Sequence, residues 1–144
     1  MRALLDVNVL VALLDGGHLH HEPAMDWLAR QAGAGWASCP LTQNGCLRIL
    51  SLPGYPNPQT PAQVASRLGA ATADRSHQFW PDGLSLLGPD RVRWDRVLSS
   101  RHITDVYLLA LAVGQGGRFV TFDRSIAVDA VPGAQKKHLH VLGS

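Results

Sequence analysis

Residues 103–123 have the sequence ITDVYLLALAVGQGGRFVTFD, which predicts a helix followed at once by a strand. The apolar run of residues 103–115 is long enough for a helix, and Gly116-Gly117 ends it. Residues 118–122 are short and mostly apolar, as buried strands are. One aspartate lies near the start of the helix and another directly after the strand, at positions 105 and 123. A helix joined directly to a buried strand is typical of an α/β protein.

The amino-terminal residues contain the same two elements in the reverse order. Residues 2–5 predict a buried strand, Asp6 follows it, and Asn8 begins a helix with an apolar face. A strand that leads straight into a helix is the usual opening of an α/β unit.

The rest of the chain continues this alternation of short apolar runs and helical patterns. Further helices are predicted over residues 23–31, after Pro40, and from the capping box Thr60-Pro61-Ala62-Gln63. Further strands are predicted over residues 36–39, near 77–80 and over 138–142, with a turn-rich connector over 51–61 and a short helix near 92–98. Such alternation predicts one domain spanning residues 1–144, in which helices flank a mainly parallel central sheet.

Composition and charge restrict the class of protein further. The chain is 46% hydrophobic and 17% charged, as globular domains are, and its 13 basic and 11 acidic residues do not mark it as a nucleic-acid binder. Its two cysteines, Cys39 and Cys46, have no zinc-site or disulfide spacing, so a reducing cytoplasm fits best. The apolar run of residues 4–14 is interrupted by Asp6 and Asn8 and is too short to span a bilayer, so no membrane association is expected.

Three aspartates, Asp6, Asp105 and Asp123, are the candidates for a functional site. Ligands of open α/β sheets bind at the carboxyl ends of the strands, where Asp6 and Asp123 are expected, and Asp105 would reach this edge from the first turn of a helix. At about 4 Å, each pair of carboxylates repels by roughly 4 kcal/mol in an effective dielectric constant of about 20. A divalent cation removes that repulsion, so the pattern predicts a Mg²⁺-type site that acts on phosphate esters. Each aspartate taken alone also suits a helix cap or a turn.

Four segments, in this order, resemble PIN-domain ribonucleases of the VapC toxin type: LLDVNVL (4–10), CPLTQNG (39–45), ITDVYLLA (103–110) and VTFD (120–123). The resemblance implies a PIN-like three-layer α/β fold. It also implies that the acidic cluster holds Mg²⁺ or Mn²⁺ and that the protein is an endoribonuclease, the toxin of a toxin–antitoxin pair, which cleaves RNA with a metal-activated water. The partners that it implies are the RNA substrate, a cognate antitoxin protein and a second copy of the chain in a homodimer.

The resemblance extends to individual site residues, with one exception. It implies that Asp6, Asp105 and Asp123 are both metal ligands and catalytic residues. Where such proteins usually have a glutamate that completes the catalytic set, this chain has Gln43. An amide oxygen is an uncharged and poorer ligand for a hard cation, so we expect an active nuclease that needs more cation. The alternative is a catalytically weakened PIN domain that binds RNA or its antitoxin without cutting.

Two other classes of acidic α/β protein fit the pattern less well. A receiver-type phosphoacceptor needs an aspartate after a central strand, but residues 27–73 contain none. A haloacid-dehalogenase-type phosphatase needs a second acid two positions after Asp6, where Asn8 lies instead.

Several other side chains have two interpretations. Candidates for RNA contacts, with an ordinary charged surface as the alternative, are Trp94, Arg48, Arg91, Arg93, Arg96 and Arg101. Asn8 and Thr121 are expected either to orient the metal ligands or to serve in helix capping and strand packing. The histidines are expected to be exposed or capping residues rather than metal ligands: His18, His20, His21, His138 and His140.

Overall fold

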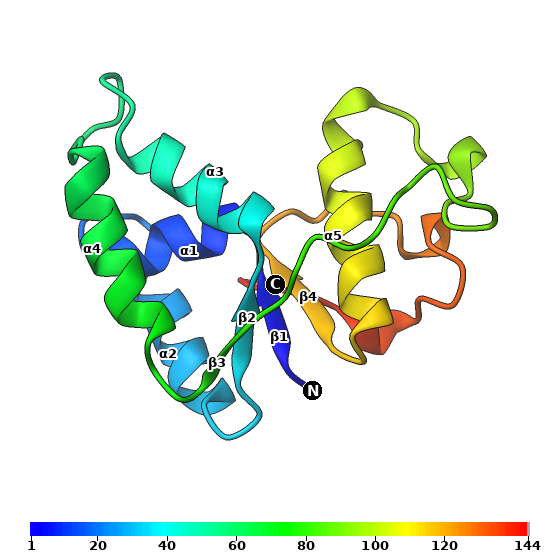
Figure 1. Cartoon of the computed structure of the whole chain (residues 1–144), viewed down its shortest axis with the longest axis horizontal. Coiled ribbons are helices and arrows are strands. Elements are labelled where there is room, and N and C mark those ends of the chain that lie inside the picture. Colours follow the sequence, from blue (N-terminus) through cyan, green and yellow to red (C-terminus); the bar gives the residue numbers. More distant parts are fainter. Residues whose placement is uncertain (144) are drawn as a thin grey trace.

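The computed structural model describes residues 1–143 and consists of a parallel sheet between two layers of helices (Figure 1). The strands in this part of the chain are β1 (Ala3–Leu5), β2 (Trp36–Ser38), β3 (His77–Phe79), β4 (Arg118–Thr121) and β5 (Leu139–Val141). They are arranged in the order β3-β2-β1-β4-β5, and each neighbouring pair is parallel. The predicted fold class, an α/β protein with a mainly parallel sheet flanked by helices, is confirmed.

Helices cover both faces of the sheet. The α-helices of the described residues are α1 (Val7–Leu14), α2 (His21–Gln31), α3 (Pro40–Leu50), α4 (Pro61–Thr72) and α5 (Ile103–Gly114). Short 3₁₀ turns are η1 (Trp94–Arg96), η2 (Ser100–His102), η3 (Val128–Ala130) and η4 (Lys136–His138). Helices α1 to α4 gather on one face, and α5 lies on the other face together with the segment between β3 and α5 (Figure 1).

The two faces of the central strands belong to two separate apolar layers. Leu4 and Phe119 are fully buried on the α5 face, in the layer that contains Leu108. Leu5 and Val120 alternate to the opposite face, where they pack among apolar side chains of α1, α3 and α4. Burying a side chain of this size contributes roughly 1.5–3 kcal/mol. Strands β1 and β4 are therefore held from both sides, which fixes the positions of the residues that follow them.

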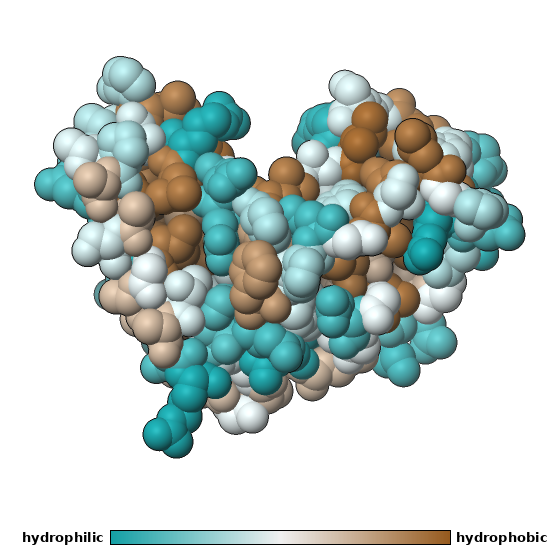
Figure 2. Space-filling model, viewed as in Figure 1, coloured by the Kyte–Doolittle hydropathy of each residue, from teal (hydrophilic) through white to brown (hydrophobic). Residues whose placement is uncertain are grey.

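The register of the sheet brings the ends of β1 and β4 to one edge. Leu5 lies opposite Val120, and the backbone N–H of Asp6 donates to the carbonyl oxygen of Val120 at 2.9 Å. Helix α5 begins at the same edge, so its first turn faces the ends of both strands (Figure 1). The space-filling view shows the molecule hollowed above this edge, between the lobe of α1 to α4 and the lobe of α5 (Figure 2).

Element boundaries differ from the predicted ones mainly for local reasons. Helix α1 begins one residue earlier than predicted, at Val7, because the side chain of Asp6 caps it. Helix α2 begins at His21, two residues before the predicted start at Pro23, since proline is tolerated in the first turn of a helix. The short helix predicted near residues 92–98 is the single 3₁₀ turn η1. No helix within residues 1–143 is long and apolar enough to cross a membrane.

The predicted exposure of the last two histidines is wrong. Strand β5 begins at Leu139 rather than at His138, because η4 occupies the preceding residues. His138 is buried, and its Nδ1 accepts a hydrogen bond from the backbone N–H of Gln135 at 2.9 Å. His140 is half-buried and stacks on Trp27, with ring centroids 5.9 Å apart.

Candidate active site

Asp6 is held at the junction of β1 and α1 by two hydrogen bonds. One carboxylate oxygen accepts from the backbone N–H of Val7 at 2.7 Å, and the other accepts from the hydroxyl of Thr121 at 2.6 Å. Only 8% of the residue is exposed. Burial raises the pKa of Asp6, the hydrogen bonds from Thr121 and Val7 oppose this, and the charge of Asp123 raises the pKa further. No positively charged side chain within residues 1–143 is among the causes of this shift, so Asp6 is a buried carboxylate without a basic partner.

Thr121, the last residue of β4, connects two of the aspartates. Its fully buried hydroxyl donates to Asp6 and accepts from the backbone N–H of Asp123 at 3.0 Å. The side-chain amide of Asn8 also donates to this hydroxyl, at 3.5 Å. Asn8 Oδ1 is buried and has no hydrogen-bond partner within the described residues. A buried acceptor without a donor usually marks a place for water or an ion, here on a residue that shares the Thr121 hydroxyl with Asp6.

Asp105 lies in the first turn of α5 and is half-buried. Burial raises its pKa to about 7, with further increases from the charges of Asp6 and Asp123 and from a hydrogen bond with Asp123, while Arg101 lowers it. Without a cation, Asp105 therefore carries a proton for much of the time at neutral pH and shares it with Asp123.

Asp123 has the opposite electrostatic character. Its Oδ1 accepts from the hydroxyl of Ser125 at 2.6 Å and from the backbone N–H of Ser125 at 2.8 Å. These two hydrogen bonds lower the pKa of Asp123. Two neighbouring carboxyl groups thus have pKa values that are pushed apart, an arrangement found frequently at functional sites.

The chemistry of this cluster fits a divalent cation, although the carboxylates are not gathered into a complete chelate. All three aspartates offer hard oxygen ligands, and their pKa values show that they sense one another's charge. Within residues 1–143, no three side chains of the His, Cys, Asp or Glu type are close enough together to hold a metal ion as they stand. Mg²⁺ is often bound by one or two carboxylates plus water, so a partly assembled set is compatible with it.

Gln43 takes part in a different hydrogen-bond network, on the β3 side of the sheet. Its Nε2 donates to the hydroxyl oxygen of Ser38 at 2.9 Å, and this hydroxyl lies 2.8 Å from Nε2 of His77. His77 also bonds the backbone of Thr72, and burial lowers its pKa. A neutral His77, the form that burial favours, can accept the Ser38 hydrogen at Nε2. None of the contacts described above for the three aspartates, within residues 1–143, involves Gln43, and its part in catalysis stays a prediction.

Of the arginines predicted to contact RNA, Arg101 is the one whose charge affects the pKa values of the site aspartates. It precedes α5 in η2 and lowers the pKa of both Asp105 and Asp123. Arg96 forms an ion pair with Asp129, with Nη1 and Oδ2 3.1 Å apart, so part of its charge is already compensated.

Two residues that the sequence did not single out lie beside the aspartates. Ser125 bonds Asp123 as described, and its hydroxyl is 3.2 Å from Nε2 of His102. The spacing of Asp123 and Ser125 is that of an Asx turn, a signal that would have indicated Ser125. His102 had no comparable signal, because its partner is 23 residues away in the sequence.

Comparison with known proteins identifies the family. The pattern of the family described as "PIN domain" matches residues 3–130. The chain belongs to the PIN-domain family.

Within that family it belongs with the VapC ribonucleases. Ribonuclease VapC44 of Mycobacterium tuberculosis is 53% identical over 142 residues, which cover 99% of this chain and 100% of VapC44. Ribonuclease VapC39 of the same organism is 42% identical over 134 residues, covering 92% of this chain and 96% of VapC39.

Two solved structures share the fold at low sequence identity. VapBC2 from Rickettsia felis, bound to a DNA fragment from its promoter, has a TM-score of 0.69 at 14% identity, covering 99% of both chains. Mycobacterium tuberculosis VapC20, a toxin that cleaves the sarcin-ricin loop, has a TM-score of 0.58 at 12% identity, covering 81% of this chain and 85% of the other. At these identities the likeness concerns the fold alone.

Proposed function

We propose that this protein is a Mg²⁺- or Mn²⁺-dependent endoribonuclease and the toxin of a toxin–antitoxin pair. The observation that carries the proposal is that three aspartates lie at one edge of the sheet, where the charges of Asp6 and Asp123 add to burial in raising the pKa of Asp105 to about 7. A cation bound there would replace the shared proton and relieve the repulsion among the carboxylates. The ribonuclease names of VapC44 and VapC39 support RNA as the substrate.

In this proposal Asp6 and Asp105 hold the cation, and Asp123 completes the set. When bound, a divalent cation supplies a nucleophilic water at neutral pH and positive charge for the transition state of phosphodiester hydrolysis. The chain itself holds the carboxylates in place: Thr121 fixes Asp6 and Ser125 fixes Asp123, through hydrogen bonds of 2.6 Å each.

Two further residues have defined parts in the proposal. Arg101, which is exposed beside Asp105 and Asp123, is positioned to attract the phosphate backbone of RNA. Gln43 has its Nε2 on Ser38, which leaves Oε1 as the atom with which it would meet a cation.

We also propose a cognate antitoxin that covers the site, a homodimer and a cytoplasmic location. The hollow between the two lobes (Figure 2) lies above the edge of the sheet at which β1 and β4 end, and we propose it as the place for both RNA and an inhibitory segment. The likeness to a chain of a VapBC structure supports the antitoxin as partner.

The test is cleavage of a labelled structured RNA in Mg²⁺, in Mn²⁺ and in a chelator. We expect cleavage with either cation, none with the chelator, and a loss of at least about a hundredfold on Asp6→Asn. The matched control is Asp26→Asn, because Asp26 is an exposed aspartate on α2. Equal cleavage by the Asp6 variant and the wild type would refute the proposed site.

The alternative function, an RNA- or antitoxin-binding module, gives a different result in the same experiment. It predicts that the wild-type protein retards the RNA in a binding assay but leaves it intact at every cation concentration. The observation that favours this alternative is the hydrogen bond from Gln43 to Ser38.

A further inference from the structure

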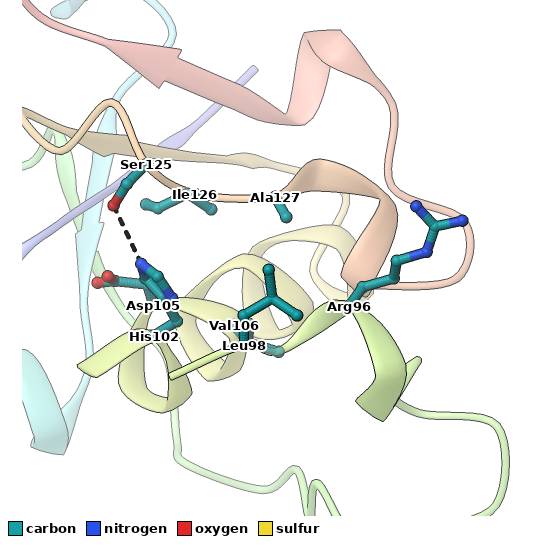
Figure 3. Close-up of a pocket in the computed structure, with 8 residues that line it drawn as sticks. All are labelled: Arg96, Leu98, His102, Asp105, Val106, Ser125, Ile126 and Ala127. Carbon is teal, nitrogen blue, oxygen red and sulfur yellow. Dashed lines mark hydrogen bonds between the residues drawn. The ribbon is translucent and has the colours of Figure 1, made fainter. Parts of the chain in front are cut away.

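A small cavity lies beside the acidic cluster, between the start of α5 and the loop that follows Asp123 (Figure 3). One side is formed by Leu98 and Val106, and the facing side by Ile126 and Ala127. Val106 directly follows Asp105, so the cavity and the cluster share the first turn of α5. The cavity measures about 70 Å³, and about 350 Å³ with the part open to solvent included, so it is small beside the roughly 300–1,000 Å³ of sites that take a whole small molecule.

A chain of hydrogen bonds joins this cavity to Asp123, and Asp105 is itself one of the lining residues. The Ser125 hydroxyl gives its one hydrogen to Asp123 at 2.6 Å, so its oxygen accepts from Nε2–H of His102 at 3.2 Å (Figure 3). This fixes the proton on Nε2 of His102. Nδ1 of the same ring makes no hydrogen bond within residues 1–143, and the other polar residues of the lining are Asp105, Ser125 and Arg96.

We propose that this cavity holds one nucleobase of the RNA strand whose phosphate lies at the three aspartates. The inference rests on the proposed ribonuclease function and adds a base-binding subsite to it. His102 is then a positioning residue: its ring lines the cavity beside Asp105, and Ser125 couples it to Asp123.

The shape and chemistry of the lining favour a base over a phosphate or a sugar. A base is a flat ring with apolar faces and polar edges, and enzymes hold extruded bases between apolar or aromatic side chains. Here two pairs of apolar side chains face each other, and Asp105, His102 and Ser125 lie at the edge next to the cluster. Arg96 lies at the opposite end of the cavity and is ion-paired with Asp129. Leu98 is 86% exposed at this cavity, an apolar surface that a bound base would cover.

The inference is tested by titrating the metal-free protein with uncharged probes: adenosine, guanosine, cytidine, uridine and, as the control ligand, ribose. ¹H–¹⁵N correlation spectra report binding at each backbone amide. We expect at least one nucleoside to shift the amides of Val106 and of residues 125–127, and ribose to leave them unchanged. The variant Ala127→Leu fills the cavity and should weaken this binding roughly tenfold or more.

Two variants control for damage to the fold. Leu98→Ser removes an exposed part of the lining and should also weaken nucleoside binding, whereas Ala62→Leu, at an exposed position of α4, should not. Equal shifts with ribose, shifts confined to other parts of the chain, or unchanged binding by both cavity variants would overturn the inference. Because the titration needs no cleavage, its outcome is separate from that of the Asp6→Asn test. RNA cleavage without nucleoside binding overturns the subsite alone, and nucleoside binding without cleavage supports the subsite while the proposed function fails.

Discussion

Replacing Asp105 by asparagine should make the cation-free protein more stable at alkaline pH, although the change removes a residue of the site. The pKa of Asp105 is raised from 3.8 to about 7, chiefly by burial and then by the charges of Asp6 and Asp123. A group whose pKa is raised on folding contributes stability that is fully present below the unfolded-state pKa and is lost as the pH rises through the folded-state pKa. The cation-free wild type should therefore lose stability between about pH 4 and pH 8, and D105N should lack this loss.

The size of the effect follows from the pKa difference. The gap between 3.8 and about 7 corresponds to ~4 kcal/mol of unfolding free energy. Screening by solvent at this half-buried carboxylate reduces the expected value to about 2 kcal/mol. Added Mg²⁺ should reverse the order, because a cation that binds only the folded state stabilises the protein that retains all three carboxylates.

The assay is urea denaturation in a chelator at several pH values from about 4.5 to 8, with wild type and variant side by side. Taking the difference between the two proteins removes the contribution of the histidines, which titrate in the same range. The matched control, Asp26→Asn, should follow the wild-type curve. A wild-type-minus-D105N difference that stays constant with pH would refute the electrostatic account of the site.

Three further changes test other parts of the structure. Thr121→Val removes the hydroxyl that donates to Asp6, so it should lower the free energy of unfolding by about 1–3 kcal/mol and reduce cleavage. Unchanged values in denaturation and cleavage assays would show that the hydroxyl does not position Asp6. Arg101→Ala should weaken RNA binding and reduce the slope of log affinity against log salt by about 1, and a parallel salt plot would exclude a phosphate contact. Gln43→Glu should reverse the Ser38 hydroxyl, so that Nε2 of His77 must donate and its pKa rises, as followed by NMR titration. In the same variant, a Mg²⁺ titration of cleavage identical to that of the wild type would remove the idea that Gln43 makes the enzyme cation-demanding.

Local sequence patterns were sufficient for the order of the elements and for the place of the carboxylates. Buried strands and helix starts depend on nearby residues, and parallel strands must end at a common edge, so the positions of Asp6 and Asp123 followed from the pattern. The first turn of α5 followed in the same way from the apolar run after Asp105.

Some of the hydrogen-bond partners that hold the site residues in place could not be predicted from the sequence. The Ser38 hydroxyl that receives Gln43 also meets His77, 39 residues further along the chain, and His102 meets Ser125 across 23 residues. Such pairs arise only when separate elements pack, and no short-range pattern encodes them. The buried position of His138 has the same origin, since η4 turns it toward the core.

The three aspartates of the site are supported by different parts of the core. Asp6 and Asp123 follow neighbouring strands, whereas Asp105 belongs to α5, which rests on the sheet through the layer of Leu108 and Phe119. The spacing between Asp105 and the other two aspartates thus depends on the thickness of this apolar layer. If the aspartates bind a cation as proposed, a cavity opened in that layer, for example by Leu108→Ala, should shift α5 on the sheet and weaken cation binding while every ligand remains in place. Cation affinity would then depend on core packing as much as on the aspartates.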